Sequence, residues 1–151
     1  MSVQPKIELE AMQLEDLDEV MDIEERCFPN PWPRRIFEME TLSPRALNLV
    51  ARINGVMGGY IISWFIYDEI HILNIAVDPE FRNMGVGKTL MRTCLDHFIE
   101  RGAKHAILEV RTSNTPAQKM YEKFGFSRIG VRKHYYSDNG EDAIIMMLTL
   151  C

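Results

Sequence analysis

The residues with the clearest chemical potential lie in a glycine-containing loop between a predicted strand and a predicted helix. Residues 74–92 read NIAVDPEFRNMGVGKTLMR, an apolar stretch followed by a glycine turn and an amphipathic segment. The first turn of a helix has unpaired N–H groups and a dipole that favours negative charge. Gly85 and Gly87 lack a Cβ, so their backbone can approach a phosphate, and Arg82 and Lys88 add positive charge. The sequence therefore predicts an anion site.

Two common nucleotide-binding motifs are excluded at this loop. A P-loop would need glycine where Arg82 stands, and a dinucleotide fingerprint would need a third glycine where Leu90 stands. The pattern R-x-x-G-x-G after a strand ending Val-Asp-Pro instead resembles motif A of the GCN5-related N-acetyltransferases, which bind the pyrophosphate of acetyl-CoA. The resemblance implies that acetyl-CoA is held by Ile75, Ala76, Val77, Arg82, Asn83, Met84, Gly85, Val86, Gly87, Lys88 and Thr89.

The same resemblance gives individual roles within motif A. The backbone of Val77 would pair with the pantetheine arm, and a backbone N–H of Ile75 or Ala76 would polarise the thioester carbonyl. Asn83 and Met84 stand where many relatives have further basic residues or glycine. Neutralisation of the phosphate charge would then depend more on Arg82 and Lys88, and the affinity for the cofactor could be weaker.

A second motif follows the predicted strand at 105–110. Glu109-Val110-Arg111-x-x-Asn114, followed by Tyr121-x-x-x-Gly125-Phe126, resembles motif B of the same family. The resemblance is strong over residues 70–129. Within the family, the chain is most similar to the ribosomal-protein-alanine N-acetyltransferase (RimI) group, through LNIAVDP, LEVRxSN, YExxGF and the tail RxxYYxxxGEDAIIM.

The reaction of this family determines which side chains the site needs. An α-amine with a pKa of about 8 must lose a proton before it attacks a thioester, and the thiolate leaving group needs an acid. The resemblance implies that Glu109 is the base, directly or through a water, and that Tyr121 is the acid and also contacts the cofactor. It also implies that Asn114 bonds the cofactor arm. From the residues alone, Glu109 could equally be an ion-pair partner at the surface, and Tyr121 a core residue.

Aromatic and acidic residues are the candidates for binding the acceptor. They come from the predicted first interhelix loop and the last hairpin loop, regions that flank the peptide site in this family: Phe28, Trp32, Tyr135, Tyr136 and Asp138. The net charge of −5 and the acidic stretch at 8–25 are compatible with a basic substrate, although a solvated helix face explains that stretch too. His71 and His134 could assist proton transfer or be structural.

The predicted elements follow the order β-α-α-β-β-β-α-β-α-β-β, an α/β fold with a mixed sheet (α+β), which is also the order of the acetyltransferase family. Asn54–Gly55 between apolar runs predicts a hairpin, and Gly125 predicts a helix end. We expect helices over 14–28, 34–42 and 114–124, a helix after Gly87, and a final antiparallel pair over 126–136 and 142–150.

Bulk properties indicate one domain, 1–151, with its own core. No apolar run approaches the roughly 20 residues of a membrane span, and the N-terminus lacks a signal-peptide pattern. The net charge of −5 argues against binding to nucleic acid or a membrane surface. Cys27, Cys94 and Cys151 are expected to be free thiols in the cytoplasm. No metal site is expected, and a monomer is the default.

The resemblance implies an enzyme that transfers acetyl from acetyl-CoA directly to the α-amine of a protein N-terminus, such as the alanine of a small-subunit ribosomal protein. The cysteines lack the setting of a nucleophile, which argues against an acetyl-cysteine intermediate. Acetylation of a lysine or a small amine is an alternative. A noncatalytic acyl-CoA-binding sensor is another, although a sensor would have no need of Glu109 and Tyr121.

Overall fold

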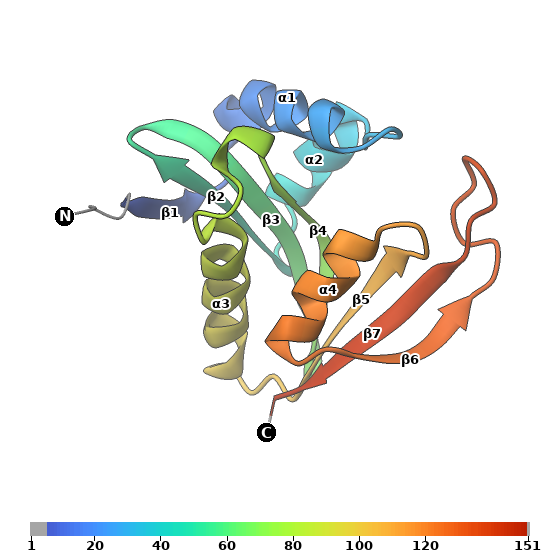
Figure 1. Ribbon diagram of the computed structural model, residues 1–151. Helices are drawn as coiled ribbons and strands as arrows, with labels where there is room; N and C mark the ends of the chain where they lie inside the picture. Colours follow the sequence, from blue (N-terminus) through green and yellow to red (C-terminus); the bar gives the residue numbers. More distant parts are fainter. Residues whose placement is uncertain (1–5, 151) are drawn as a thin grey trace.

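A single seven-stranded sheet forms the centre of the molecule. The structure is a computed structural model and describes residues 6–150. The strand order is β1-β2-β3-β4-β5-β7-β6, and every neighbouring pair is antiparallel except β4 and β5 (Figure 1). The strands are β1 (Ile7–Ala11), β2 (Ala46–Ile53), β3 (Val56–Ile66), β4 (Glu69–Val77), β5 (His105–Arg111), β6 (Ser127–Arg132) and β7 (Ala143–Thr149). The predicted α/β class with a mixed sheet is confirmed.

Helices cover both faces of the sheet. They are α1 (Leu17–Cys27), α2 (Arg34–Thr41), α3 (Val86–Ile99) and α4 (Thr115–Phe124), with short 3-10 turns at Leu14–Asp16 and Pro79–Phe81. Because successive strand residues point to opposite faces, the sheet divides the core into two clusters. In Figure 1, α1 and α2 lie on one side of the sheet and α3 and α4 on the other. One cluster packs against α1 and α2 and contains Tyr60 and Ala76; the other packs against α3 and α4 and contains Ile75 and Leu108.

Local signals explain where these elements begin and end. Asn54 and Gly55 both have positive φ, 54° and 82°, as the predicted two-residue hairpin turn requires. Asn114 caps α4 because its side chain accepts a hydrogen bond from the N–H of Ala117, and Gly125 ends the helix in the left-handed conformation.

The structure differs from the predicted elements at two places. The predicted helix over 14–28 is a 3-10 turn followed by α1, because the Asp16 carboxylate accepts the N–H of Gln13 at the turn. The predicted strand over 126–136 ends at Arg132, since His134 has a φ of 52° and its N–H bonds Asp142. Residues 133–142 therefore form a loop, and β7 lies between β5 and β6.

Candidate active site

A cleft opens where β4 and β5 separate. The two strands pair only from Glu69–His105 to Ile72–Leu108, and the β3–β4 register shifts between Ile62 and Ser63, which leaves Leu73 as an extra residue in β4. Such a bulge bends a strand and re-aims its side chains. The resulting cavity has a volume of about 460 Å³. Of the residues predicted from sequence, its lining contains Phe28, Trp32, Ile75, Glu109, Asn114, Tyr121 and Tyr136.

The free edge of β4 offers backbone groups to this cleft. The N–H of Asp78 bonds the carbonyl of Gly58, and antiparallel pairs alternate between bonded and unbonded residues. The N–H and C=O groups of Ile75 and Val77 therefore point away from β3, and the carbonyl of Val77 accepts from the Cys27 thiol at 3.5 Å. The N–H of Ala76 faces β3, and its side chain is buried against α1 and α2. Of the two residues predicted to polarise a carbonyl, only Ile75 presents its N–H toward the cleft.

The predicted anion loop lies at the start of α3, outside the cavity lining. Asn83 and Gly85 both have positive φ, 65° and 85°, and asparagine and glycine tolerate this conformation best. Exposed backbone N–H groups in such a loop form a concavity that suits phosphate. A Cβ on Gly87 would make only ordinary contacts with the protein, at 3.4 and 3.5 Å. The residue types at the loop thus fit a pyrophosphate that approaches the backbone.

Side chains around this loop are partly committed to other contacts. Val86 is buried in the core, so only its backbone can reach a ligand. The Thr89 hydroxyl donates to the carbonyl of Gly85 at 2.7 Å, and Arg82 donates to the carbonyl of Val77 at 3.3 Å. Met84 and Lys88 are exposed and open to a ligand. Arg82 and Lys88 are the basic side chains of this loop, and their contact with phosphates stays a prediction.

Glu109 lies on β5 with its carboxylate between two basic side chains. His71 Nε2 is 2.9 Å from Oε2, and Arg132 Nε is 3.6 Å from Oε1. The hydrogen bond from His71 is the main cause that holds the pKa of Glu109 below its usual value, against the opposing effect of burial. Glu109 is therefore ionised at neutral pH and able to accept a proton.

Tyr121 reaches the same cavity from the other face of the sheet. Leu108 and Val110 belong to the cluster under α3 and α4, so Glu109 between them points to the opposite face. Tyr121 on α4 packs edge-on against Phe126 with ring centroids 6.0 Å apart. Burial raises the pKa of its phenol well above 10, so the hydroxyl keeps its proton. The cleft thus joins an ionised carboxylate on one face to a protonated phenol on the other.

The predicted acceptor residues divide into two groups. Phe28, Trp32 and Tyr136 line the cavity, and Trp32 packs against Phe37 with centroids 5.3 Å apart. Tyr135 is half exposed and packs edge-on against Tyr136, outside the lining. Asp138 is also outside the lining, and it accepts hydrogen bonds from Arg111 and Asn30, which do line the cavity.

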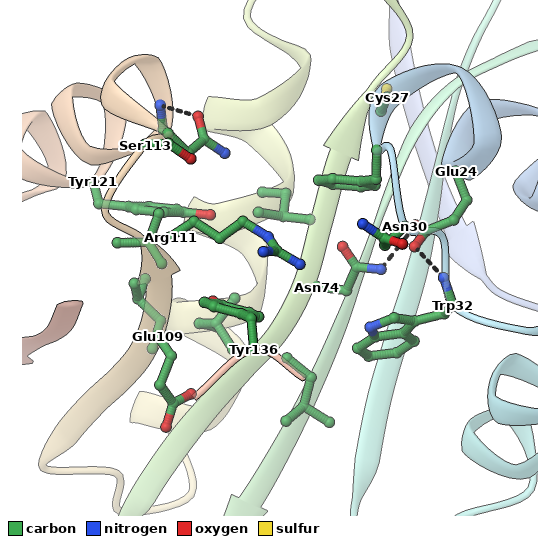
Figure 2. A pocket seen from close by; sticks show the side chains of 18 of the residues that line it. Glu24, Cys27, Asn30, Trp32, Asn74, Glu109, Arg111, Ser113, Tyr121 and Tyr136 are labelled. Atoms are coloured by element: carbon green, nitrogen blue, oxygen red, sulfur yellow. Dashed lines mark hydrogen bonds between the residues drawn. The ribbon is translucent and has the colours of Figure 1, made fainter. Parts of the chain in front are cut away.

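Arg111, Glu24 and Asn74 are cavity residues that the sequence did not identify as site residues. Arg111 lies 3.9 Å from the Tyr136 ring centroid and donates to Asp138 at 2.8 Å, which ties the loop 133–142 to β5. Glu24 is buried and accepts a hydrogen bond from the side chain of Asn74, as Figure 2 shows. The sequence does contain a signal for Glu24. Its position in the helical repeat places this charged residue on the apolar face of α1, together with Leu17 and Val20.

The remaining predictions concern thiols, metals and membranes. Cys27 and Cys94 are free, and burial is the main cause that raises the pKa of both, that of Cys94 to about 11. Cys151 lies outside the described residues. Within residues 6–150, no group of three or more His, Cys, Asp or Glu side chains is placed to hold a metal ion. Across the same range, no helix combines the length and apolarity needed to cross a membrane.

Comparisons with known proteins agree with the geometry. The model of the Acetyltransferase (GNAT) family matches residues 17–126. A Bacillus subtilis (strain 168) protein is 45% identical over 92% of this chain and 93% of its own; its name assigns it provisionally as a ribosomal protein bS18-alanine N-acetyltransferase. The ribosomal protein bS18-alanine N-acetyltransferase of Escherichia coli (strain K12) is 35% identical over 94% of this chain and 97% of its own.

A solved structure extends the similarity to three dimensions. The crystal structure of the ribosomal-protein-S18-alanine N-acetyltransferase from Escherichia coli superposes with a TM-score of 0.87 at 35% identity. The match covers 95% of this chain and 94% of that one.

Proposed function

The chain belongs to the acetyltransferase (GNAT) family, and we propose that it transfers acetyl from acetyl-CoA to the α-amine of a protein N-terminus. The observation that carries this proposal is the cleft between β4 and β5. It brings the ionised Glu109 and the protonated Tyr121 to one cavity from opposite faces of the sheet. An acyl donor and an amine can then approach from the two faces and meet inside the molecule.

Acetyl-CoA supplies an acetyl group activated as a thioester. We assign its phosphates to the loop 82–89, where the helix N-terminus, Arg82 and Lys88 are available. The outward-facing C=O of Ile75 and N–H of Val77 would bind the pantetheine arm as an added strand does. Asn114 would contribute its side-chain NH₂, because its side-chain oxygen already caps α4.

The proton transfers that the reaction requires define a role for Glu109 and a role for Tyr121. The ammonium form of the substrate loses a proton to Glu109, directly or through a water, and the amine lone pair becomes available. The N–H of Ile75 stabilises the oxyanion that forms as the amine adds to the carbonyl. Tyr121 then gives its proton to the departing sulfur, and the second proton that the nitrogen loses as the amide forms restores the Tyr121 phenol. The raised pKa of the Cys27 thiol argues against a covalent acetyl-cysteine route.

For the acceptor, we propose an alanine N-terminus of a small-subunit ribosomal protein, as the names of the two relatives state for those proteins. Phe28, Trp32 and Tyr136 provide an aromatic wall for an extended peptide entering end-on. We also propose that residues 1–151 act as one domain and as a monomer in the cytoplasm, where ribosomal proteins are available.

Thiol release from acetyl-CoA with two matched peptides tests the proposal. One peptide has a free alanine N-terminus and no lysine; the other has a blocked N-terminus and one free lysine. We expect turnover only with the first. Turnover only with the second would make the protein a lysine acetyltransferase. Binding of acetyl-CoA without turnover on either peptide would favour a small-amine acceptor or a sensor.

A further inference from the structure

A buried carboxylate beside the cleft accepts hydrogen bonds from three neutral groups. Glu24 on α1 is 1% exposed. Its Oε1 accepts hydrogen bonds from the Tyr60 hydroxyl at 2.5 Å and from the Asn74 side-chain nitrogen at 2.9 Å, and its Oε2 accepts the backbone N–H of Trp32 at 2.9 Å. Within residues 6–150, no Lys, Arg or His forms an ion pair with it. All three donors are neutral.

This network determines which way the Asn74 side chain faces. A carboxylate only accepts hydrogen bonds, so the amide nitrogen of Asn74 must point toward Glu24. Tyr60 is fully buried, and burial raises the pKa of its phenol, so the hydroxyl keeps its proton and donates it to Oε1 of Glu24. The amide oxygen of Asn74 is consequently turned away from Glu24 and toward the interior of the cavity (Figure 2). Asn74 follows the bulge in β4, at the point where the strand leaves β5.

We propose that the amide oxygen of Asn74 binds an N–H of the acceptor amine, and that Glu24 is a positioning residue that fixes this orientation. The inference rests on the proposed function, because it requires an amine acceptor. An amide oxygen accepts an N–H from the ammonium and from the neutral amine without taking a proton. Asn74 therefore holds the nitrogen in place while its proton leaves to Glu109 and its lone pair turns to the thioester.

The substitution Glu24→Gln tests the orientation directly. The backbone N–H of Trp32 is a fixed donor, so the new side chain must keep its oxygen toward Trp32 and place its NH₂ toward Asn74. Asn74 must then rotate its amide to accept that hydrogen bond. The rotation presents an NH₂ group to the cavity, and a donor faces the ammonium of the substrate.

Steady-state kinetics with the alanine peptide would show this change. A hydrogen bond to a charged group contributes about 1.5–3 kcal/mol, so we expect Glu24→Gln to raise KM for the peptide about ten- to a hundred-fold. KM for acetyl-CoA should stay close to that of the wild type, while the melting temperature should fall modestly because the NH₂ at this position no longer accepts the Tyr60 hydroxyl. A structural role alone would instead raise both KM values together.

A second substitution should rescue the first. In Glu24→Gln with Asn74→Asp, the NH₂ of the residue at 24 donates to one carboxylate oxygen of the residue at 74, and the other oxygen faces the cavity. We expect KM for the peptide to return to within about threefold of the wild type. Asn74→Asp alone places two carboxylates side by side and should lower the melting temperature, which the double variant restores.

The outcomes separate this inference from the proposed function. If the wild type acetylates the peptide while Glu24→Gln leaves its KM unchanged, or the double variant is no better than Glu24→Gln, the role of Asn74 is wrong and the proposed function stands. If the wild type acetylates no amine, both fail together.

Discussion

Two carboxylates approach the cleft from opposite walls, and their surroundings differ. Glu24 on α1 is buried and accepts only from neutral donors, the Tyr60 hydroxyl, the Asn74 amide and the Trp32 N–H. Glu109 on β5 is 12% exposed at its side chain and faces His71 and Arg132, which are themselves 29% and 53% exposed.

Because of this difference, Glu24 is suited to hold a neighbouring side chain in one orientation, and Glu109 is suited to accept and release a proton. Neutral donors in a buried network have fixed positions, so Glu24 can determine how Asn74 faces the cavity. Glu109 has partners that reach solvent, and its carboxylate is 2.9 Å from the ring of His71. A base must release the proton that it takes, and only the second environment provides a route for that. The same side chain thus suits two roles because of what surrounds it.

The largest expected effect is on turnover, and it belongs to Glu109 alone. Glu109→Gln removes the proton acceptor and keeps the shape of the side chain. We expect kcat to fall about 10²- to 10⁴-fold. The dissociation constant for acetyl-CoA, measured by calorimetry, should stay unchanged. Glu24→Gln is the matched control: the same substitution at the other carboxylate should change KM for the peptide and not cause this fall in kcat. Unchanged turnover in Glu109→Gln would refute the assignment of the base.

The second effect is on stability, and it belongs to Glu24. Glu24→Ala leaves the buried hydroxyl of Tyr60 and the N–H of Trp32 without an acceptor, at a cost of about 1–3 kcal/mol for each such group. We expect the free energy of unfolding in urea to fall by about 2–4 kcal/mol. Glu109→Ala should lose less than about 1 kcal/mol, because its partners are solvated. If Glu24→Ala and Glu109→Ala lowered the free energy of unfolding equally, the different surroundings of the two carboxylates would have no effect on stability.

Much of the fold could be predicted because its signals are local. Asn54–Gly55 makes a hairpin through its own backbone preferences, and Gly125 ends α4 for the same reason. The insertion of β7 between β5 and β6 has no such signal, because it depends on pairing between distant segments. The bulge at Leu73 that opens the cleft is likewise visible only in the register against β3.

The residues of the site likewise divide into those with a local sequence signal and those defined by contacts between distant segments. Glu109 and Tyr121 could be identified from linear motifs, and both line the cavity. Glu24 lies among acidic neighbours on α1, and what distinguishes it is contact with residues 36 and 50 positions away. Asp138 was predicted to meet the substrate, which stays a prediction; its ion pair with Arg111 was not visible in the sequence.

The smallest effect concerns the partner of Glu109 and is measured as a pKa. The hydrogen bond from His71 is the main cause that keeps the pKa of Glu109 below its ordinary value of 4.5. His71→Ala should therefore raise that pKa, and His71→Gln, which keeps a donor, should raise it less. Side-chain carboxyl NMR across a pH titration would measure both. A pKa that is the same in all three proteins would show that His71 has no influence on the base.

The lowered pKa of Glu109 also predicts how the stability of the protein depends on pH. A folded-state pKa below the unfolded value means that ionised Glu109 stabilises the fold above pH 4.5 and that this stabilisation is lost as the pH falls through the lowered pKa. The part of the stability difference between wild type and His71→Ala that comes from Glu109 should thus be present at pH 7 and disappear in acid. Repeating both measurements in a Glu109→Gln background isolates that part, because a glutamine at 109 does not titrate. A stability difference with the same pH dependence in both backgrounds would place its origin outside the pair formed by His71 and Glu109.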